Sequence, residues 1–557
     1  MISRICTTRT LVATGAALAA AASLSLFASA ASPRFYDDDP IWVERDTEDA
    51  SRITRLDVDL TVDLAYNIVQ GFRQPEQVRA LNVNSVDEVP DSSWFTNRAG
   101  HLALTPEMVA RGPNRTDGPA SGPWTVTSSK SDGVTPGFTI KDAAGQRWFL
   151  KFDPPGHRGM ATGTEVAVTK LMWALGYNVP ENHIAYFRRQ QLVVADSATF
   201  TPAGGASRAM RASDVDALLS RAEREPDGSY RVVASRSLEG TPIGRIRFVD
   251  TRPDDPNDVV PHQHRRELRG YGVFAAWLDH VDAKAINSLD TLVTKDGRSY
   301  VRHHLIDFGS TLGSGGVAPS DYWEGAEYLV EPKQVVKQMI GFGLVAPRWQ
   351  RTSFYEAPSI GRMPANNRVF DPRSWKPRVP NQAFLHARPD DRFWAARKLM
   401  AISTDMIRAA VATGQFGDPD AEAFLVRALA ERRDAIGRAF LTGVNPIADM
   451  ALDADGTLTF RNVAVEADVA RTPDEYQAVW SRFDNATGQS QVVGVTVSGA
   501  TALSAPMRLP ARNDAFIRVQ VSADGAEHES WSMPVDAYFR LKAGRWQLVG
   551  FERMPEP

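Results

Sequence analysis

A single polar stretch near the middle of the chain restricts its possible folds more than any other feature. An apolar helical stripe is predicted over 265–278, and a hairpin with its turn at 295–298 leads into Asp307-Phe308-Gly309. Between them, residues 280–287 carry polar side chains in the fixed order His280, Asp282, Lys284 and Asn287. Charged side chains beside an apolar helix are costly unless they form ion pairs or belong to a functional site. This stretch is therefore the strongest candidate for a functional site.

A second segment, upstream, has matching chemistry. Residues 138–152 have the pattern of a β-hairpin, and Lys151 lies on its second strand. A helix is predicted to follow, with Glu165 in its first turn and with apolar residues at helical spacing at Val168, Leu171, Met172 and Leu175. A hydroxyl-rich, glycine-containing loop is expected at 128–137, directly before the hairpin.

The order of these elements resembles the protein-kinase-like superfamily. The resemblance rests on the spacing H-x-D-x-K-x-x-N at 280–287, on Asp307-Phe308-Gly309 after a hairpin, and on a lysine-bearing strand followed by a glutamate-bearing helix. It covers residues 124–445 and is more similar to the atypical bacterial HipA-type and CotH-type kinases than to eukaryotic signalling kinases. It implies an α+β, two-lobed kinase-like domain with a β-rich N-lobe and a helical C-lobe.

The resemblance also implies a role for each polar residue. Asp282 would orient the attacking hydroxyl, and Lys284 would place a cation beside the transferred phosphoryl group. Asn287 and Asp307 would supply the oxygen ligands that Mg²⁺ prefers. The residues expected to hold the phosphates of ATP or another nucleoside triphosphate are Lys151, oriented by Glu165, together with Ser128, Ser129 and Gly133.

Several of these residues also have plainer interpretations. Lys151 could face solvent from an edge strand, and Glu165 could simply favour the positive end of a helix. The tripeptide at 307–309 is common in turns. His280 is expected to pack under the polar loop in either case. No second cluster of possible metal ligands stands at a suitable spacing from His303 and His304, so we interpret both as sheet residues.

The sequence departs from the signalling kinases at two points. No G-x-G-x-x-G stands where the phosphates would lie, so the phosphate-binding loop is the weakest part of the resemblance. Val281 precedes Asp282, where signalling kinases carry the arginine that binds a phosphorylated activation loop. Regulation by phosphorylation of that loop is therefore not predicted.

The first thirty residues differ from the rest of the chain. Arg4 and Arg9 precede an apolar stretch over 11–27 and the small residues Ala28-Ser29-Ala30, a pattern typical of a secretory signal peptide. An uncleaved N-terminal anchor is the alternative. The expected location is periplasmic or extracellular, with no membrane span left after cleavage. The only cysteine, Cys6, would leave with the signal, so the mature chain would have no disulfide.

Length and net charge indicate how many domains the chain has and which partners it does not bind. Its 557 residues predict two or three domains, and a net charge of −4 without a basic face argues against nucleic-acid binding. We expect an N-terminal extension at 31–123 and a β-rich accessory domain at 450–557. The latter's aromatics could line a ligand surface but are more typical of a core: Trp531, Tyr538, Phe539, Trp546 and Phe551. Helices are predicted at 331–342, 392–413 and 421–440.

Two classes of function follow from these expectations. The first is an exported kinase-like phosphotransferase that moves a phosphoryl group from a magnesium–nucleotide to a hydroxyl of a protein or small molecule. The second is a non-catalytic pseudokinase scaffold that acts as a binding protein of the cell envelope. Export favours the scaffold because nucleoside triphosphates are scarce outside the cytoplasm, whereas the complete polar set favours the enzyme. The same residues could also transfer a nucleotidyl group, AMP.

Overall fold

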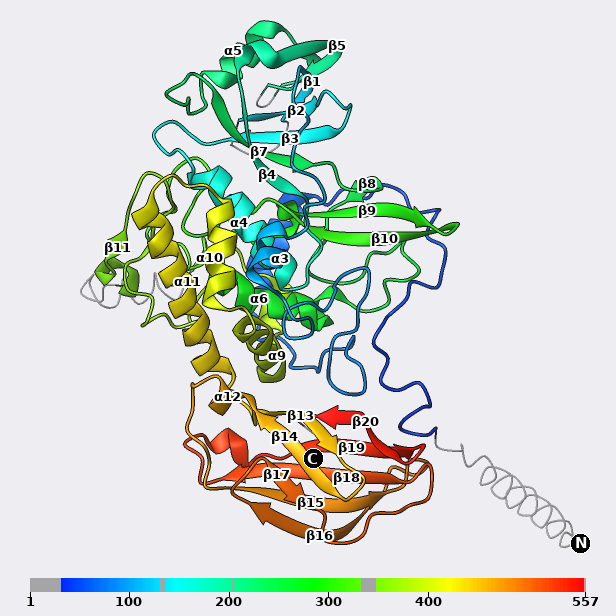
Figure 1. Cartoon of the computed structure of the whole chain (residues 1–557). Helices are drawn as coiled ribbons and strands as arrows, with labels where there is room; N and C mark the ends of the chain where they lie inside the picture. The colour runs from blue at the N-terminus through cyan, green and yellow to red at the C-terminus, as the bar shows by residue number, and fades with distance from the viewer. Residues whose placement is uncertain (1–31, 131–135, 203–204, 332–346, 555–557) are drawn as a thin grey trace, which may run out of the picture.

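The protein has a mixed α+β architecture in which sheets and helices occupy different parts of the molecule (Figure 1). The computed structural model describes residues 32–130, 136–202, 205–331 and 347–554. The predicted signal peptide and Gly133 lie outside these ranges, as does almost all of the helix predicted at 331–342. Within the described ranges, no helix is long and apolar enough to cross a membrane.

A seven-stranded sheet forms one end of the molecule, with strand order β4-β7-β3-β2-β1-β5-β6 (Figure 1). The predicted hairpin at 138–152 is confirmed as the antiparallel pair β2 and β3. Helix α4 (Met160–Ala174) connects β3 to β4, and the short helix α5 (Ala212–Leu219) lies near β5. The strands are β1 (Trp124–Ser129), β2 (Gly137–Lys141), β3 (Arg147–Phe152), β4 (Asn182–Phe187), β5 (Leu192–Phe200), β6 (Arg208–Ala209) and β7 (Tyr230–Arg236).

Alternation along β3 decides which residues face the core of this sheet. Trp148, Leu150 and Phe152 are buried in its apolar cluster, so Lys151 lies on the opposite face. Because β3 is paired on both sides, by β2 and β7, the edge-strand interpretation of Lys151 is wrong.

Helix α6 (Arg266–Leu278) runs through the middle of the molecule and is buried along almost its whole length. It packs against α9 (Pro389–Met400), α11 (Pro419–Phe440) and α8 (Gln382–Leu385). The single helix predicted at 392–413 is in fact two, α9 and α10 (Thr404–Thr413). The break arises because the Ser403 hydroxyl accepts a hydrogen bond from the Met406 N–H, capping a new helix in the middle of the apolar pattern.

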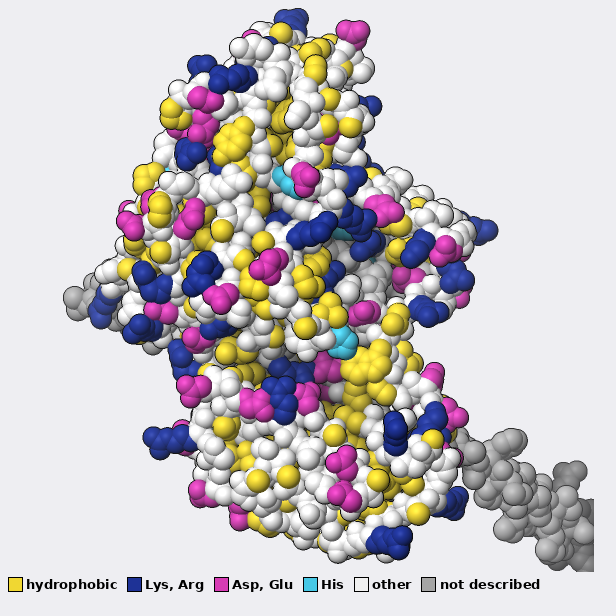
Figure 2. All heavy atoms as spheres, in the orientation of Figure 1, with side chains coloured by type: hydrophobic (Ala, Val, Ile, Leu, Met, Phe, Trp, Pro, Cys, Tyr) yellow, Lys and Arg dark blue, Asp and Glu magenta, His cyan; other side chains and the backbone are white. Residues whose placement is uncertain are grey.

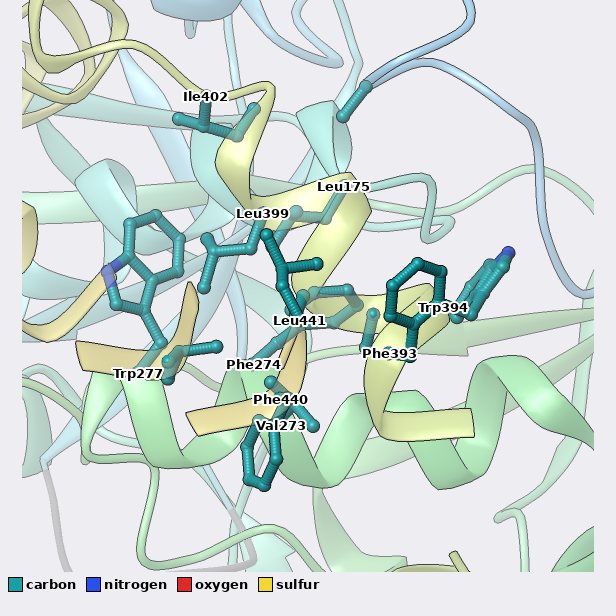
Figure 3. Close-up of a cluster of buried hydrophobic side chains, with 14 of the residues drawn as sticks. Leu175, Val273, Phe274, Trp277, Phe393, Trp394, Leu399, Ile402, Phe440 and Leu441 are labelled. Atoms are coloured by element: carbon teal, nitrogen blue, oxygen red, sulfur yellow. The ribbon is translucent and has the colours of Figure 1, made fainter. Parts of the chain in front are cut away.

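Side chains from α6, α9 and α11 meet in a common apolar core (Figure 3). Trp277 and Phe274 on α6 are fully buried there, and the Trp277 indole N–H donates to the Leu429 carbonyl at 2.8 Å. Leu399 and Trp394 approach from α9. The polar loop at 280–287 follows α6 directly, so this core fixes the position of the loop.

Replacing Trp277 with alanine should lower the free energy of unfolding by about 3–5 kcal/mol, because it leaves a large cavity in the core. Urea unfolding followed by circular dichroism measures the change. The matched control is Trp42→Ala, since Trp42 is 44% exposed and its loss should cost less than about 1 kcal/mol. Equal effects of the two substitutions would contradict this assignment of the core.

A small sheet and the N-terminal segment lie beside this helical core. The predicted hairpin after the polar loop is confirmed as β9 (Ser288–Lys295) and β10 (Arg298–Leu305), and β8 (Thr241–Gly244) extends it. The segment from Ala50 to Leu56 lies against this sheet through the Ala50 N–H to Ser299 carbonyl bond. Two helices belong to the N-terminal segment, α2 (Leu60–Gln70) and α3 (Pro106–Arg111). Two short strands, β11 (Phe354–Tyr355) and β12 (Met363–Pro364), pair further along the chain.

The last hundred residues form two antiparallel sheets at the far end of the molecule (Figure 1). Of the aromatics predicted above, Trp531, Tyr538, Phe539 and Phe551 are buried and Trp546 is half-buried, so they form a core. The elements are β13 (Ile447–Leu452), β14 (Thr457–Asn462), α12 (Val463–Glu466), β15 (Glu475–Phe483), β16 (Ser490–Ser498), β17 (Ala502–Ser504), β18 (Phe516–Asp524), β19 (Val535–Lys542) and β20 (Arg545–Glu552).

Candidate functional site

Lys151 stands between two carboxylates on the face of the seven-stranded sheet that turns away from its core. Its Nζ lies 3.0 Å from Glu165 Oε2 and 2.8 Å from Asp307 Oδ1. The side chain of Glu165 is 2% exposed and that of Lys151 is 18% exposed, so the pair is largely shielded from water. The consecutive elements β3 and α4 and the distant segment at Asp307 therefore meet at one ammonium group.

Burial and charge act in opposite directions on this cluster. Burial alone would lower the pKa of Lys151, but Asp307 and Glu165 together outweigh it and raise this pKa above its ordinary value. Burial alone would raise the pKa of Asp307, but the Lys151 ammonium outweighs it and lowers this pKa. Both groups are therefore charged at neutral pH.

Glu165 lies deeper in its helix than the sequence predicts. Helix α4 begins at Met160, so Glu165 is not in the first turn and does not cap the helix. That task falls to Asp153, which accepts hydrogen bonds from the main-chain N–H groups of Ala161 and Thr162 at 3.0 and 2.9 Å. Because Asp153 caps the helix, Glu165 can pair with Lys151. Our sequence analysis did not identify Asp153.

The polar loop after α6 forms a second cluster around Asp282. Lys284 Nζ lies 2.7 Å from Asp282 Oδ1, and Asn287 Nδ2 donates to Asp282 Oδ2 at 2.9 Å. Arg378 lies 3.5 Å from the same Oδ1 atom and also pairs with Glu324. The sequence gives no local signal for Arg378, because almost a hundred residues separate it from Asp282.

The two clusters are joined through the β9–β10 hairpin. Ser288 pairs with Leu305, and the next main-chain contact is the Ile306 N–H donating to the Asn287 carbonyl at 3.0 Å. The hairpin therefore holds the end of the polar loop beside the residue that precedes Asp307. Gly309 packs closely here, because a Cβ at this position would lie 3.1 Å from Glu165 Oε2, a tight contact.

The histidines near the site have structural environments. His280 is buried against Phe308 and Tyr271, and burial lowers the pKa of its imidazole to about 4. His303 stacks on Trp94 and binds Asp290, so it is a sheet residue as predicted.

A cavity of about 560 Å³ opens in front of Lys151. Of the residues predicted to hold the nucleotide, Ser128, Ser129, Lys151 and Glu165 line it, and Asp307 does so too. Ser128 and Ser129 belong to strand β1 rather than to a loop, since Ser129 pairs with Phe138. The residues predicted for catalysis and metal binding on the polar loop do not line this cavity. They are Asp282, Lys284 and Asn287, and their loop adjoins it. The lining has further cations that the sequence analysis missed: Lys130, Arg147, Arg236 and Arg245.

Asp307 and Asn287 have the chemistry of a magnesium site. The Asp307 side chain is 38% exposed and ionised, and the contacts of Asn287 Nδ2 with Asp282 leave its amide oxygen as the ligating atom. The described residues contain no group of three or more His, Cys, Asp or Glu side chains arranged around a metal ion. Mg²⁺ in nucleotide sites commonly takes only one or two protein oxygens plus phosphate oxygens, so the chemistry of Asp307 and Asn287 would suit this ion.

No protein-family model matches the sequence, and no curated protein matches it. Two solved structures to which the chain is weakly similar are kinases. The Helicobacter pylori proinflammatory kinase CtkA is 12% identical with a TM-score of 0.25, over 56% of this chain and 94% of that one. The Golgi casein kinase is 9% identical with a TM-score of 0.21, over 71% and 95%. These likenesses are too weak to assign a function, which must come from the residues themselves.

Proposed function

We propose that the protein is a kinase-like phosphotransferase that moves a phosphoryl group from a magnesium–nucleotide to a hydroxyl acceptor. The observation that carries this proposal is Lys151 between Glu165 and Asp307 at the mouth of a cavity, with the Asp282 cluster beside it. Phosphoryl transfer needs mainly fixed cations for the phosphates and a carboxylate for the attacking hydroxyl. This arrangement supplies both and supports a protein-kinase-like, two-lobed fold.

In this proposal each cluster has its own task. Lys151, fixed by Glu165, holds phosphate oxygens in the cavity, and Lys130 adds positive charge at its rim. Asp282 accepts a hydrogen bond from the acceptor hydroxyl and takes its proton as the oxygen attacks phosphorus. Lys284, paired with Asp282, is placed to neutralise charge on the transferred group.

Asp307 and Asn287 would hold Mg²⁺ in this site. The ion would neutralise phosphate charge as it develops during transfer. Lys151 already neutralises one oxygen of Asp307, so this carboxylate stays ionised and ready to ligate.

The remaining parts of the proposal concern where the protein acts and on what. We propose export through the N-terminal signal and place the chain with the atypical HipA-type and CotH-type kinases. The acceptor is a hydroxyl on a protein or small molecule. The scaffold interpretation predicts nucleotide or partner binding without turnover, and the experiments below separate it from the enzyme.

Mg²⁺ and ATP together should raise the unfolding temperature of the purified protein. A nucleotide at 100 times its dissociation constant adds about 2.7 kcal/mol to the free energy of unfolding, which is several degrees. Neither EDTA-treated ATP nor Mg²⁺ alone should give the full shift. Lys151→Met removes the phosphate-binding cation and should abolish the shift, whereas Lys141→Met, on the exposed end of β2, should keep it. An equal shift in both variants would contradict the proposed site.

A further inference from the structure

A second and larger cavity, of about 880 Å³, adjoins the proposed nucleotide cavity, and Arg147 and residues 236–238 line both cavities. Its charged lining is strongly unbalanced. Only Glu181 and Glu239 carry negative charge there, against the six arginines Arg98, Arg111, Arg115, Arg147, Arg236 and Arg302. Figure 2 shows Lys and Arg side chains gathered between α3 and the β9–β10 hairpin.

The fold holds several of these arginines in fixed positions. Arg98 donates to the Trp173 carbonyl at 2.8 Å and packs over the Trp173 ring. Arg302 donates to Asn178 Oδ1 at 3.2 Å, and Arg236 pairs with Glu181 at 2.7 Å. Each contact uses one or two of the five N–H donors of a guanidinium, so donors remain for a ligand. Burial, and to a smaller extent the neighbouring Arg302, lower the pKa of Arg98 to about 10.

His304 gives a second, independent sign of a ligand. It lines the same cavity, is 5% exposed, and its Nδ1 atom has no hydrogen-bond partner within the described part of the chain. Burial lowers the pKa of His304 to about 3, so its imidazole is neutral. The Thr291 hydroxyl, 3.1 Å from Nε2, can donate to that nitrogen, which leaves the proton on Nδ1 as a buried donor with no partner among the described residues.

We propose that this cavity binds a small, multiply charged anion that carries several phosphate or sulfate groups. Guanidinium groups that converge from different segments suit phosphate and sulfate groups. Each guanidinium can make paired, charge-assisted hydrogen bonds to the oxygens of the anion. Arg147 and Arg236 come from the seven-stranded sheet, whereas Arg98 and Arg302 come from the body of the molecule. The bound anion therefore bridges the sheet and the helical body. This site does not depend on the proposed function.

Isothermal titration calorimetry of the purified protein at about 150 mM salt, without Mg²⁺, tests the proposal. Inositol hexakisphosphate should bind at least about 100-fold more tightly than orthophosphate, because many charges are met at once. Inositol hexasulfate, run in parallel, distinguishes a phosphate site from a sulfate site. Lys151→Met, in the other cavity, should leave binding of the hexakisphosphate unchanged, which separates this site from the nucleotide site.

Substitutions of the lining residues should change the affinity for the hexakisphosphate in opposite directions. R115Q and R302Q, at arginines that line only this cavity, should each weaken binding of the hexakisphosphate about tenfold or more, the effect of one lost charge-assisted contact. E239Q should strengthen it about twofold, since it removes a repulsive charge at an exposed position. R471Q, on a side chain that is 86% exposed and distant in sequence from the lining, is the matched control and should change nothing. Absence of binding in the wild type, or unchanged affinity in both R115Q and R302Q, would overturn the proposal.

Discussion

Asp282→Asn should lower the rate of phosphoryl transfer by at least about 100-fold while leaving nucleotide affinity nearly unchanged. The substitution keeps the shape of the side chain, and its amide oxygen can still accept from Asn287 Nδ2. It removes the negative charge that would take the hydroxyl proton, a contribution of about 100-fold to 10,000-fold in rate. A 100-fold loss corresponds to roughly 2.7 kcal/mol of transition-state stabilisation. Transfer of labelled phosphate and a nucleotide titration measure the two effects separately.

Asp57→Asn is the matched control for this prediction, because the Asp57 side chain is 63% exposed and pairs with the nearby Arg55 at 2.9 Å. It removes the same charge without touching the cavity and should keep full activity. A wild type that binds Mg-nucleotide but transfers nothing supports the scaffold. Transfer by the wild type that Asp282→Asn leaves intact would falsify the assignment of Asp282 as the base. Release of pyrophosphate instead of a nucleoside diphosphate would point to nucleotidyl transfer.

The sequence predicts well those parts of the molecule that local patterns determine. The hairpin β2–β3, helix α6 and hairpin β9–β10 all appear where periodicity and turn residues place them. The Lys151–Glu165 ion pair is likewise confirmed, although the expected first-turn position of Glu165 is wrong. A buried lysine needs a carboxylate partner to offset the cost of burial. The predicted pair is therefore correct although the predicted helix boundary is not.

Features that depend on tertiary contacts escaped sequence reasoning. Arg378 reaches Asp282 only because the chain between 347 and 381 folds back over the polar loop. The six arginines of the second cavity come from separate segments, none of which forms a basic run. Ser403 stops a helix by one hydroxyl contact within an otherwise continuous apolar pattern. For Arg378 and the arginines the deciding interactions are between residues far apart in the sequence, whereas the Ser403 contact with Met406 is local and was hidden by the continuous apolar pattern.

Asp307→Asn should make nucleotide binding independent of Mg²⁺ and lower transfer by at least about 100-fold. An amide is a much poorer ligand for Mg²⁺ than a carboxylate, so the metal no longer adds to the affinity. Asparagine is a better choice than alanine here because Asp307 has a φ of 61°, in the left-handed region that asparagine tolerates and alanine does not. Titrations of nucleotide with and without Mg²⁺ on both proteins measure the effect.

Without Mg²⁺ the Asp307→Asn variant should bind nucleotide at least as well as the wild type, because a carboxylate facing the phosphates repels them. Lys151 keeps Glu165 as a partner in the variant, so its position at 3.0 Å from that carboxylate should persist and the protein should remain folded. Asp307→Ala, by contrast, should lower the unfolding temperature through backbone strain at φ 61°. If Asp307→Asn unfolds at the wild-type temperature yet retains the full effect of Mg²⁺ on affinity, Asp307 is not a metal ligand. The charge on Asp307 would then serve only to hold Lys151 in place.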